Sequence, residues 1–368
     1  MTPTTATAAT AATAVPGVTG QRGSVRRLLA TAALCLLPAL GVQARDTPDA
    51  IPLDTTFNAT EQAAKLFTVA QGQAMQGVKK VAVPLFSVEF VTGDNERAET
   101  SGFAAAGRSS AAIYYQLKGV DETDFQAITT ALYQRFLTDL ATAGFEVLTQ
   151  DQVAASPTYR SLAASGTPSP IKSDGAITLA PPGMAIYGFN KEQSGGSSNS
   201  KSLFGALSKL SAGFSAVGAV MDTPKLQQEL GAALIEVQMK VNFVKLSNGN
   251  RGFLGRLSNT ASVGGKVEPT ITSAIFSVQS STRGALTLSN PLTLDPAAFS
   301  EVRDKPTTAG DTAGAVAVGL LRLALNSKDS SSTQQLEAVA DPARYREVVT
   351  QGLGTVAQMF VQRLKAGE

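Results

Sequence analysis

KKVAVPLFSVEFVTGD, residues Lys79–Asp94, predicts the first strand of a buried sheet. Val78–Val83 predicts the opening strand, and its last three residues, Val81-Ala82-Val83, are all apolar, as expected for a strand that is covered on both faces. Pro84 has no amide donor for a sheet ladder, so it marks an edge, a bulge or the end of the strand. Beyond it, apolar and other residues alternate with the period of a strand. The residues on the more apolar face are Phe86, Val88 and Phe90, and those on the opposite face are Ser87, Glu89 and Val91.

The segments that follow this strand predict a loop and a returning partner. Thr92–Ser109 is polar and rich in glycine, which favours a loop. Ser110–Val120 can return as a strand that pairs with the first one.

The next unit combines a helix with a short strand. Asp121 can cap a helix that ends at Gly144, and Phe145–Leu148 then predicts a strand. The apolar residues of the helix recur at three- and four-residue spacing, so they should lie against the sheet. They are Phe125, Ile128, Leu132, Phe136 and Leu140.

A second helical region is expected directly afterwards. Thr149 and Gln152 have the spacing of a capping box, and the helix should run in two pieces around Pro157. A loop rich in proline and serine, Thr167–Pro182, leads to a candidate strand at Met184–Phe189.

Ala232–Leu246 predicts a long, half-buried strand. Its apolar face holds Ile235, Val237, Met239, Val241 and Phe243, and its polar face holds Glu236, Gln238, Lys240 and Asn242. Ser247–Asn250 has the composition of a turn. Further strands of a meander are expected at Ser258–Lys266, Ile271–Val278 and Ala285–Ser289.

The carboxyl-terminal part of the chain predicts two helices. Asp311 or Thr312 can cap the first, which should run to Asn326 and be followed by a serine-rich linker. Asp341–Pro342 opens the second. The apolar face of that last helix holds Tyr345, Val349, Val356, Phe360 and Leu364.

These elements predict an α+β fold, with a mixed, largely antiparallel sheet packed by two or three helices and an inserted amphipathic helix. Residues 78–368 should form one domain, which carries a mobile insertion at 190–225. Residues 45–77 are expected to be a flexible lead-in with a short helix near Glu61–Met75.

The first 44 residues predict a secretory signal peptide behind a low-complexity leader. Arg26 and Arg27 precede the apolar run LLATAALCLLPALGV, which ends at Val42-Gln43-Ala44. A charged region, an apolar region and a small-residue cleavage site follow in the order that a signal peptide requires. We expect cleavage after Ala44 and an exported protein, either periplasmic or associated with the outer membrane.

Composition excludes several classes of chemistry. The chain has no histidine, and its single cysteine lies in the apolar run of the leader. The mature chain therefore cannot form disulfides, thiolate nucleophiles, zinc sites or a Ser-His-Asp triad. The leader holds three of the 31 basic residues, which leaves 28 against 29 acids and a net charge of −1. We expect no cofactor, no metal and no nucleic-acid partner.

One segment is a candidate contact surface for a partner. Lys201–Met221 follows a GGSSNS linker and repeats apolar residues at helical spacing, with few charges opposite them. It is either a core or lid helix of the domain or a surface that binds a protein partner or a second copy of the chain. An outer-membrane surface is a further candidate. The stripe consists of Leu203, Leu207, Leu210, Phe214, Val217 and Met221.

The order VAVPLF, ALYQRFLTDLATAGFEVLTQ, MAIYGF and VQMKVNFVKLSNGN, within about Val78–Asn250, resembles the superfamily of the curli secretion channel CsgG and the TolB amino-terminal domain. This resemblance implies a periplasmic or outer-membrane-associated protein that acts by binding and assembly. The channel member forms a ring whose subunits contribute β-hairpins to a pore. The present chain departs from it, because it has no lipidated cysteine and no evident pair of strands reserved for lipid. The resemblance brings no catalytic residues.

Three function classes remain open. The first is a non-catalytic envelope protein that oligomerises or docks on a partner in secretion or surface assembly. The second is a periplasmic carrier or sensor domain for a small ligand or peptide. The third is an enzyme that uses carboxylates or a Ser-Lys pair, although no paired motif singles out such residues.

Overall fold

The computed structural model describes residues 49–54, 56–100, 109–187, 219–248, 260–305, 315–316, 320–326 and 331–367. The chain divides into the units Met1–Arg45 and Asp46–Glu368, and every described residue belongs to the second unit. The predicted signal peptide therefore lies outside the described residues.

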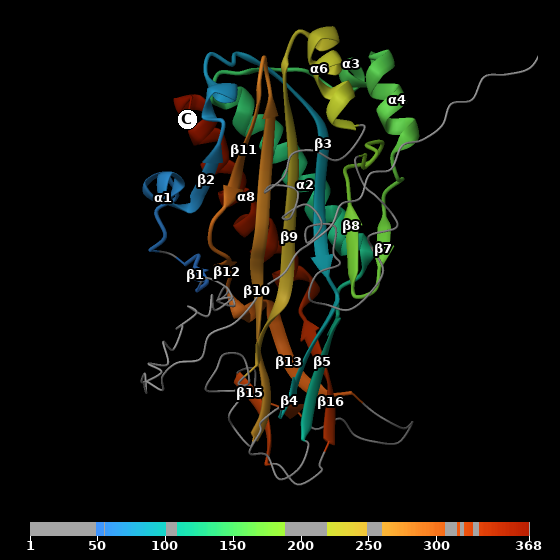
Figure 1. Ribbon diagram of the computed structural model, residues 1–368, viewed down its shortest axis with the longest axis vertical. Coiled ribbons are helices and arrows are strands. Elements are labelled where there is room, and N and C mark those ends of the chain that lie inside the picture. Colours follow the sequence, from blue (N-terminus) through green and yellow to red (C-terminus); the bar gives the residue numbers. More distant parts are fainter. Residues whose placement is uncertain are drawn as a thin grey trace, which may run out of the picture. The chain divides into compact units, whose positions relative to one another are not determined.

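A mixed sheet of eleven strands, the main sheet, is built around β3 (Lys80–Val91). β3 pairs in parallel with β9 (Ala233–Asn248) and β6 (Glu146–Val147), and antiparallel with β8 (Ala176–Leu179). The other strands are β1 (Ile51–Pro52), β2 (Phe67–Ala70), β7 (Ile171–Ser173), β10 (Thr260–Gln279), β11 (Arg283–Leu288), β12 (Leu292–Thr293) and β15 (Leu320–Asn326). Figure 1 shows β3, β9 and β10 side by side at its centre.

Pro84 lies inside β3 and does not end it. The register between β3 and β9 shifts between Ala82 and Leu85, which are the residues on either side of the proline segment. Of the three roles that the sequence allowed, the structure therefore shows a bulge.

Two long helices cover one face of the main sheet. They are α2 (Glu122–Thr142) and α8 (Pro342–Ala366), which contact each other (Figure 1). The ring of Phe136 on α2 lies 5.9 Å from that of Phe86 on β3. The rings of Phe276 on β10 and Phe360 on α8 are stacked at 4.3 Å. These contacts confirm the predicted apolar faces of both helices.

The predicted helix caps are confirmed as well. Asp121 and Asp124 form a capping box at the start of α2. Thr149 and Gln152 form another, which begins α3 (Gln150–Ala155), and α4 (Pro157–Ser165) follows as the second piece. A shorter helix, α1 (Ala59–Leu66), contacts α8.

A second sheet has the strand order β14-β13-β16-β5-β4. Its strands are β4 (Gly93–Glu99), β5 (Ser110–Lys118), β13 (Phe299–Asp304), β14 (Ala315–Val316) and β16 (Ser331–Ala340). β3 belongs to the main sheet and continues through Thr92 into β4, which belongs to the second sheet. The two sheets are therefore joined by consecutive strands. The amides of Thr92 and Gly93 donate to the carbonyl of Gly175, at 2.8 and 3.1 Å. A Cβ on Gly175 would lie 2.5 Å from the Gly93 oxygen, so this crossing requires a glycine.

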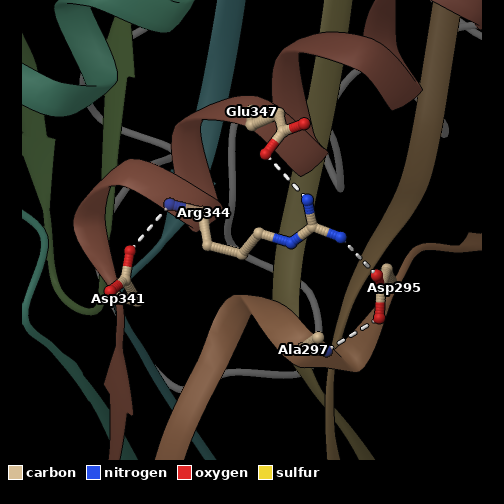
Figure 2. Close-up of polar contacts among 5 residues, drawn as sticks. All are labelled: Asp295, Ala297, Asp341, Arg344 and Glu347. Carbon is tan, nitrogen blue, oxygen red and sulfur yellow. Dashed lines mark hydrogen bonds and ion pairs between the residues drawn. The ribbon is translucent and has the colours of Figure 1, made fainter.

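Arg344 joins the start of α8 to the short helical turn η3 (Pro296–Ala298), which leads into the second sheet. Its guanidinium binds Glu347 at 2.7 Å and Asp295 at 2.9 Å, and its amide donates to Asp341 (Figure 2). Asp295 also accepts a hydrogen bond from the amide of Ala297. That amide, and then Arg344, hold the pKa of the Asp295 carboxyl below its ordinary value. The helix start and the turn are thus fixed together.

Several predicted elements on the amino-terminal side are wrong. Ser110–Lys118 pairs with β4 and β16 and not with β3. Gly93–Glu99, predicted as part of a loop, is β4, because pairing with β5 outweighs its weak strand propensity. Thr167–Pro182, also predicted as a loop, contains the β7–β8 hairpin. The strand predicted at Met184–Phe189 is only an isolated bridge at Ile186 within the described residues.

The carboxyl-terminal predictions also need correction. Leu320–Asn326 is not the end of a helix but strand β15, which pairs antiparallel with β10. The serine-rich linker continues into β16, which is held between β5 and β13. The strands predicted at Ser258–Lys266 and Ile271–Val278 are one strand, β10, as far as they lie in the described residues from Thr260 on, and its pairing with β9 is irregular after Val267 and after Ile271. The fold is α+β, as predicted, but the described residues form two mixed sheets where one was expected.

Candidate functional site

The face of the main sheet opposite α2 and α8 carries a row of polar side chains on β3 and β9. On β9 it carries Glu236, Gln238, Lys240 and Asn242, as the alternation of the sequence predicts. The register of β3 and β9 places Glu89 beside Lys240 and Ser87 beside Gln238. These side chains form the candidate functional site.

Glu236 and Arg283 of this face form a connected cluster with Tyr187 and Thr223, and we call these four residues the anchor network. Glu236 accepts hydrogen bonds from Arg283 Nη2 at 2.7 Å and from the Tyr187 hydroxyl at 3.2 Å. Arg283 Nη1 donates to Thr223 Oγ1 at 3.3 Å. Burial, and then the neighbouring Glu236, raise the pKa of Tyr187 well above its ordinary value, so its hydroxyl stays protonated as a donor.

The anchor network holds the two segments that flank residues 188–218. Tyr187 is the last described residue before that range, and Thr223 belongs to α6 (Ala219–Leu230), which begins directly after it. Both contact the same ion pair on the sheet. The far end of α6 is fixed separately, because Glu229 accepts hydrogen bonds from Ser156 and Thr158 at the start of α4. These two hydroxyls lower the pKa of Glu229.

Ser87 and Glu89 are buried polar residues on the same face. The side chain of Glu89 is 1% exposed, and Lys240 Nζ lies 3.0 Å from one of its oxygens. Within the described part of the chain, the other Glu89 oxygen and the Ser87 hydroxyl have no hydrogen-bond partner. Such groups are rare in folded proteins, because an unmatched buried donor or acceptor costs about 1–3 kcal/mol.

Two asparagines connect this face to the second sheet. Asn242 donates to Asp94 at 2.9 Å, and Asn248 donates to Glu96 at 2.9 Å. Burial raises the pKa of the Asp94 carboxyl above its ordinary value, although the hydrogen bond from Asn242 acts in the opposite direction. The polar face therefore ends where the two sheets meet.

The predicted contact stripe lies almost wholly outside the described residues. This holds for Leu203, Leu207, Leu210, Phe214 and Val217. Met221 belongs to α6, but its side chain is not described. The expected insertion at 190–225 overlaps the start of α6, where Thr223 is buried.

Sequence reasoning found part of the polar face and missed the anchor network. The alternation of β9 identified Glu236 as polar-facing, but nothing local connects it to Tyr187, Thr223 or Arg283. Those contacts depend on the pairing of β9, β10 and β11.

No helix in the described ranges is long and apolar enough to cross a membrane. In the same ranges, no group of three or more acidic residues is placed to hold a metal ion. Comparison with known protein families, curated proteins and solved structures finds no match to this chain. The resemblance to the CsgG and TolB superfamily therefore remains a prediction.

Proposed function

We propose that this chain is a non-catalytic, exported envelope protein that self-associates or docks on a protein partner, as a component of secretion or surface assembly. Its contact surface is the stripe from Leu203 to Met221. Cleavage after Ala44 releases it to the periplasm or to the outer-membrane surface. The resemblance to the CsgG and TolB superfamily agrees with a role in binding and assembly.

The anchor network is the observation that supports this proposal. Tyr187 and Thr223 flank the segment that carries the stripe, and both bind the ion pair of Glu236 and Arg283. Burying charged and hydroxyl groups is costly unless their hydrogen bonds are made, so this arrangement favours one geometry. A partner bound to the segment is then held at a defined place on the main sheet.

The residues of the segment suit close contact with another protein. Its apolar positions repeat over about five helical turns. Gly205, Ala212, Gly213 and Gly218 lie among them, and small residues allow another backbone to approach closely. Left exposed, such a stripe promotes association.

Light scattering on the chain that starts at Arg45 tests the proposal. Deleting residues 194–217, which keeps α6 intact, should abolish self-association and leave the melting temperature nearly unchanged. Leu207→Asp with Phe214→Asp should act in the same way. Ser198→Asp with Ser200→Asp adds the same charge outside the stripe and is the matched control.

Two results would contradict the proposal. Unfolding of the domain by the deletion means that the stripe is ordinary core. Unchanged association in both variants means that the contact surface lies elsewhere. Export has its own test, since mass spectrometry of the envelope fraction should find an amino terminus at Arg45.

A further inference from the structure

We propose that Asn248 guards the outer edge of β4 and so prevents this strand from pairing with the β4 of a second copy of the chain. The residues of this edge are different from those of the contact stripe. The guard therefore suppresses a second mode of self-association.

Every second residue of β4 directs its backbone groups away from β5. The carbonyl of Thr92 accepts a hydrogen bond from the amide of Leu117, and the amide of Thr100 donates to the carbonyl of Ser109, both at 2.9 Å. In an antiparallel pair, residues that exchange hydrogen bonds alternate with residues that do not. The odd-numbered residues of β4 therefore direct their amides and carbonyls toward its outer edge. They are Gly93, Asn95, Arg97 and Glu99.

Side chains occupy backbone groups at the middle of this edge. Asn248 Nδ2 donates to the carbonyl of Arg97 at 2.7 Å. The amide of Asn95 donates to the carboxylate of Asp94 at 2.9 Å. Free amides and carbonyls along a strand edge recruit other strands, and native proteins suppress this by covering the edge. The carbonyl of Arg97 is thus covered by one side chain.

Asn248 reaches this carbonyl from a different sheet. Within the described residues, β4 belongs to the second sheet and β9 to the main sheet, and no strand ladder joins them. The same Nδ2 of Asn248 also donates to Glu96 at 2.9 Å, and Asn242 donates to Asp94 at 2.9 Å. Because these contacts come from side chains, a single substitution can remove the cover without breaking a ladder.

The uncovered edge of β4 is complementary to itself. When two copies of β4 pair antiparallel about Ala98, Arg97 of each copy faces Glu99 of the other. Both residues direct their backbone groups outward, so the two copies can exchange hydrogen bonds at these positions. Opposite charges that face each other across strands favour such pairing. The two side chains are 62% and 60% exposed, so they are accessible to a second copy.

Light scattering over a dilution series of the chain that starts at Arg45 tests the proposal. Asn248→Ala should strengthen self-association about tenfold or more, because each of the two copies loses a hydrogen bond that competes with pairing. Asn248→Ser, whose side chain is too short to reach the carbonyl of Arg97, should act in the same way. Asn290→Ala is the matched control, since it removes another asparagine that donates to a backbone carbonyl, that of Asp49 at 3.4 Å.

Adding Glu99→Lys to Asn248→Ala tests the pairing itself. Arg97 of each copy then faces a second cation, so the association should return to that of the original chain. The same increase on Asn248→Ala should appear in the variant that lacks residues 194–217.

Four results would overturn the proposal. Unchanged association in both Asn248 variants means that this side chain does not protect the edge. Loss of the fold in both variants means that Asn248 supports the fold and not the edge. An increase that Glu99→Lys leaves unaltered places the contact on another strand. An increase that requires residues 194–217 assigns the contact to that segment.

Discussion

Glu236 and Arg283 form an ion pair of 2.7 Å that reaches across β10, from β9 to β11. Ser277 on β10 is in register with Glu236 on one side and with Ala285 on the other. Because the serine and alanine side chains are small, the guanidinium can lie above the intervening strand. The pair therefore connects two strands that are each paired with β10.

Replacing Arg283 with methionine should destabilise the protein strongly. Glu236 is then left buried without its cation, and breaking a buried pair in this way costs about 3–5 kcal/mol. Urea denaturation should show this loss in the free energy of unfolding. Arg346→Met, which breaks a more exposed pair with Asp124, should cost less than about 1 kcal/mol.

The double variant Glu236→Gln with Arg283→Met isolates the cause. It should recover much of the loss, because no buried charge remains unpaired. If the loss of stability in the double variant equals the sum of the losses in the two single variants, the ion pair has no special role.

Phe136→Ala should lower the free energy of unfolding by about 3–5 kcal/mol, since it opens a cavity between α2 and the aromatic rings of Phe86, Phe276 and Phe360. Gln134→Ala, on the exposed side of the same helix, should change it by less than about 0.5 kcal/mol. Denaturant titration of both variants checks which side of α2 faces the core. Equal losses of unfolding free energy in the two variants would contradict the predicted apolar face.

Asp94→Asn should stabilise the protein near neutral pH. The folded state raises the pKa of Asp94 above its ordinary value of 3.8, so it binds the proton more tightly than the unfolded chain does. Stability is therefore lost as the pH rises from that ordinary value through the raised one. The amide stays neutral and can still accept the hydrogen bond from Asn242.

Melting temperatures measured against pH test this prediction. The advantage of the Asp94→Asn variant over the original chain should shrink as the pH falls below the ordinary value, because Asp94 is then protonated in both states. Equal destabilisation at acidic and neutral pH would contradict the prediction, because the effect of the substitution would then not depend on the ionisation of Asp94.

Gly265→Ala should destabilise the contact between the two sheets. A Cβ at this position on β10 would lie 2.7 Å from Cε2 of Tyr115 on β5. Overpacking of this kind costs about 1–3 kcal/mol. Thermal unfolding should show most of the penalty removed in a Tyr115→Ala background, and an unchanged penalty there would mean that Tyr115 is not the obstacle.

Local patterns predicted the elements whose periodicity is strong. The three- and four-residue spacing of Phe125, Ile128 and Leu132 indicated α2, and the alternation around Met239 indicated β9. The same alternation put Ser87 and Glu89 on one face of their strand, but it contained no information on their burial.

The missed elements depend on partners that lie far along the chain. Ser331–Ala340 has the composition of a linker, yet it is a strand because β5 and β13 flank it. Leu320–Asn326 is apolar enough for either a helix or a strand, and the long β10 decides between them. Arg283 was missed for the same reason, because only the order of β9, β10 and β11 brings it to Glu236.

The parallel pairing of β5 with β16 constrains the timing of folding. Ser110 pairs with Ser331, roughly 220 residues later, and α8 follows only after that strand. Contacts this distant in sequence form slowly, because a large loop must close before they contribute. The second sheet cannot be completed, nor the main sheet covered by α8, until almost the whole polypeptide has been synthesised. Until then β5 and β13 lack the strand that lies between them, and such unpaired edges favour aggregation.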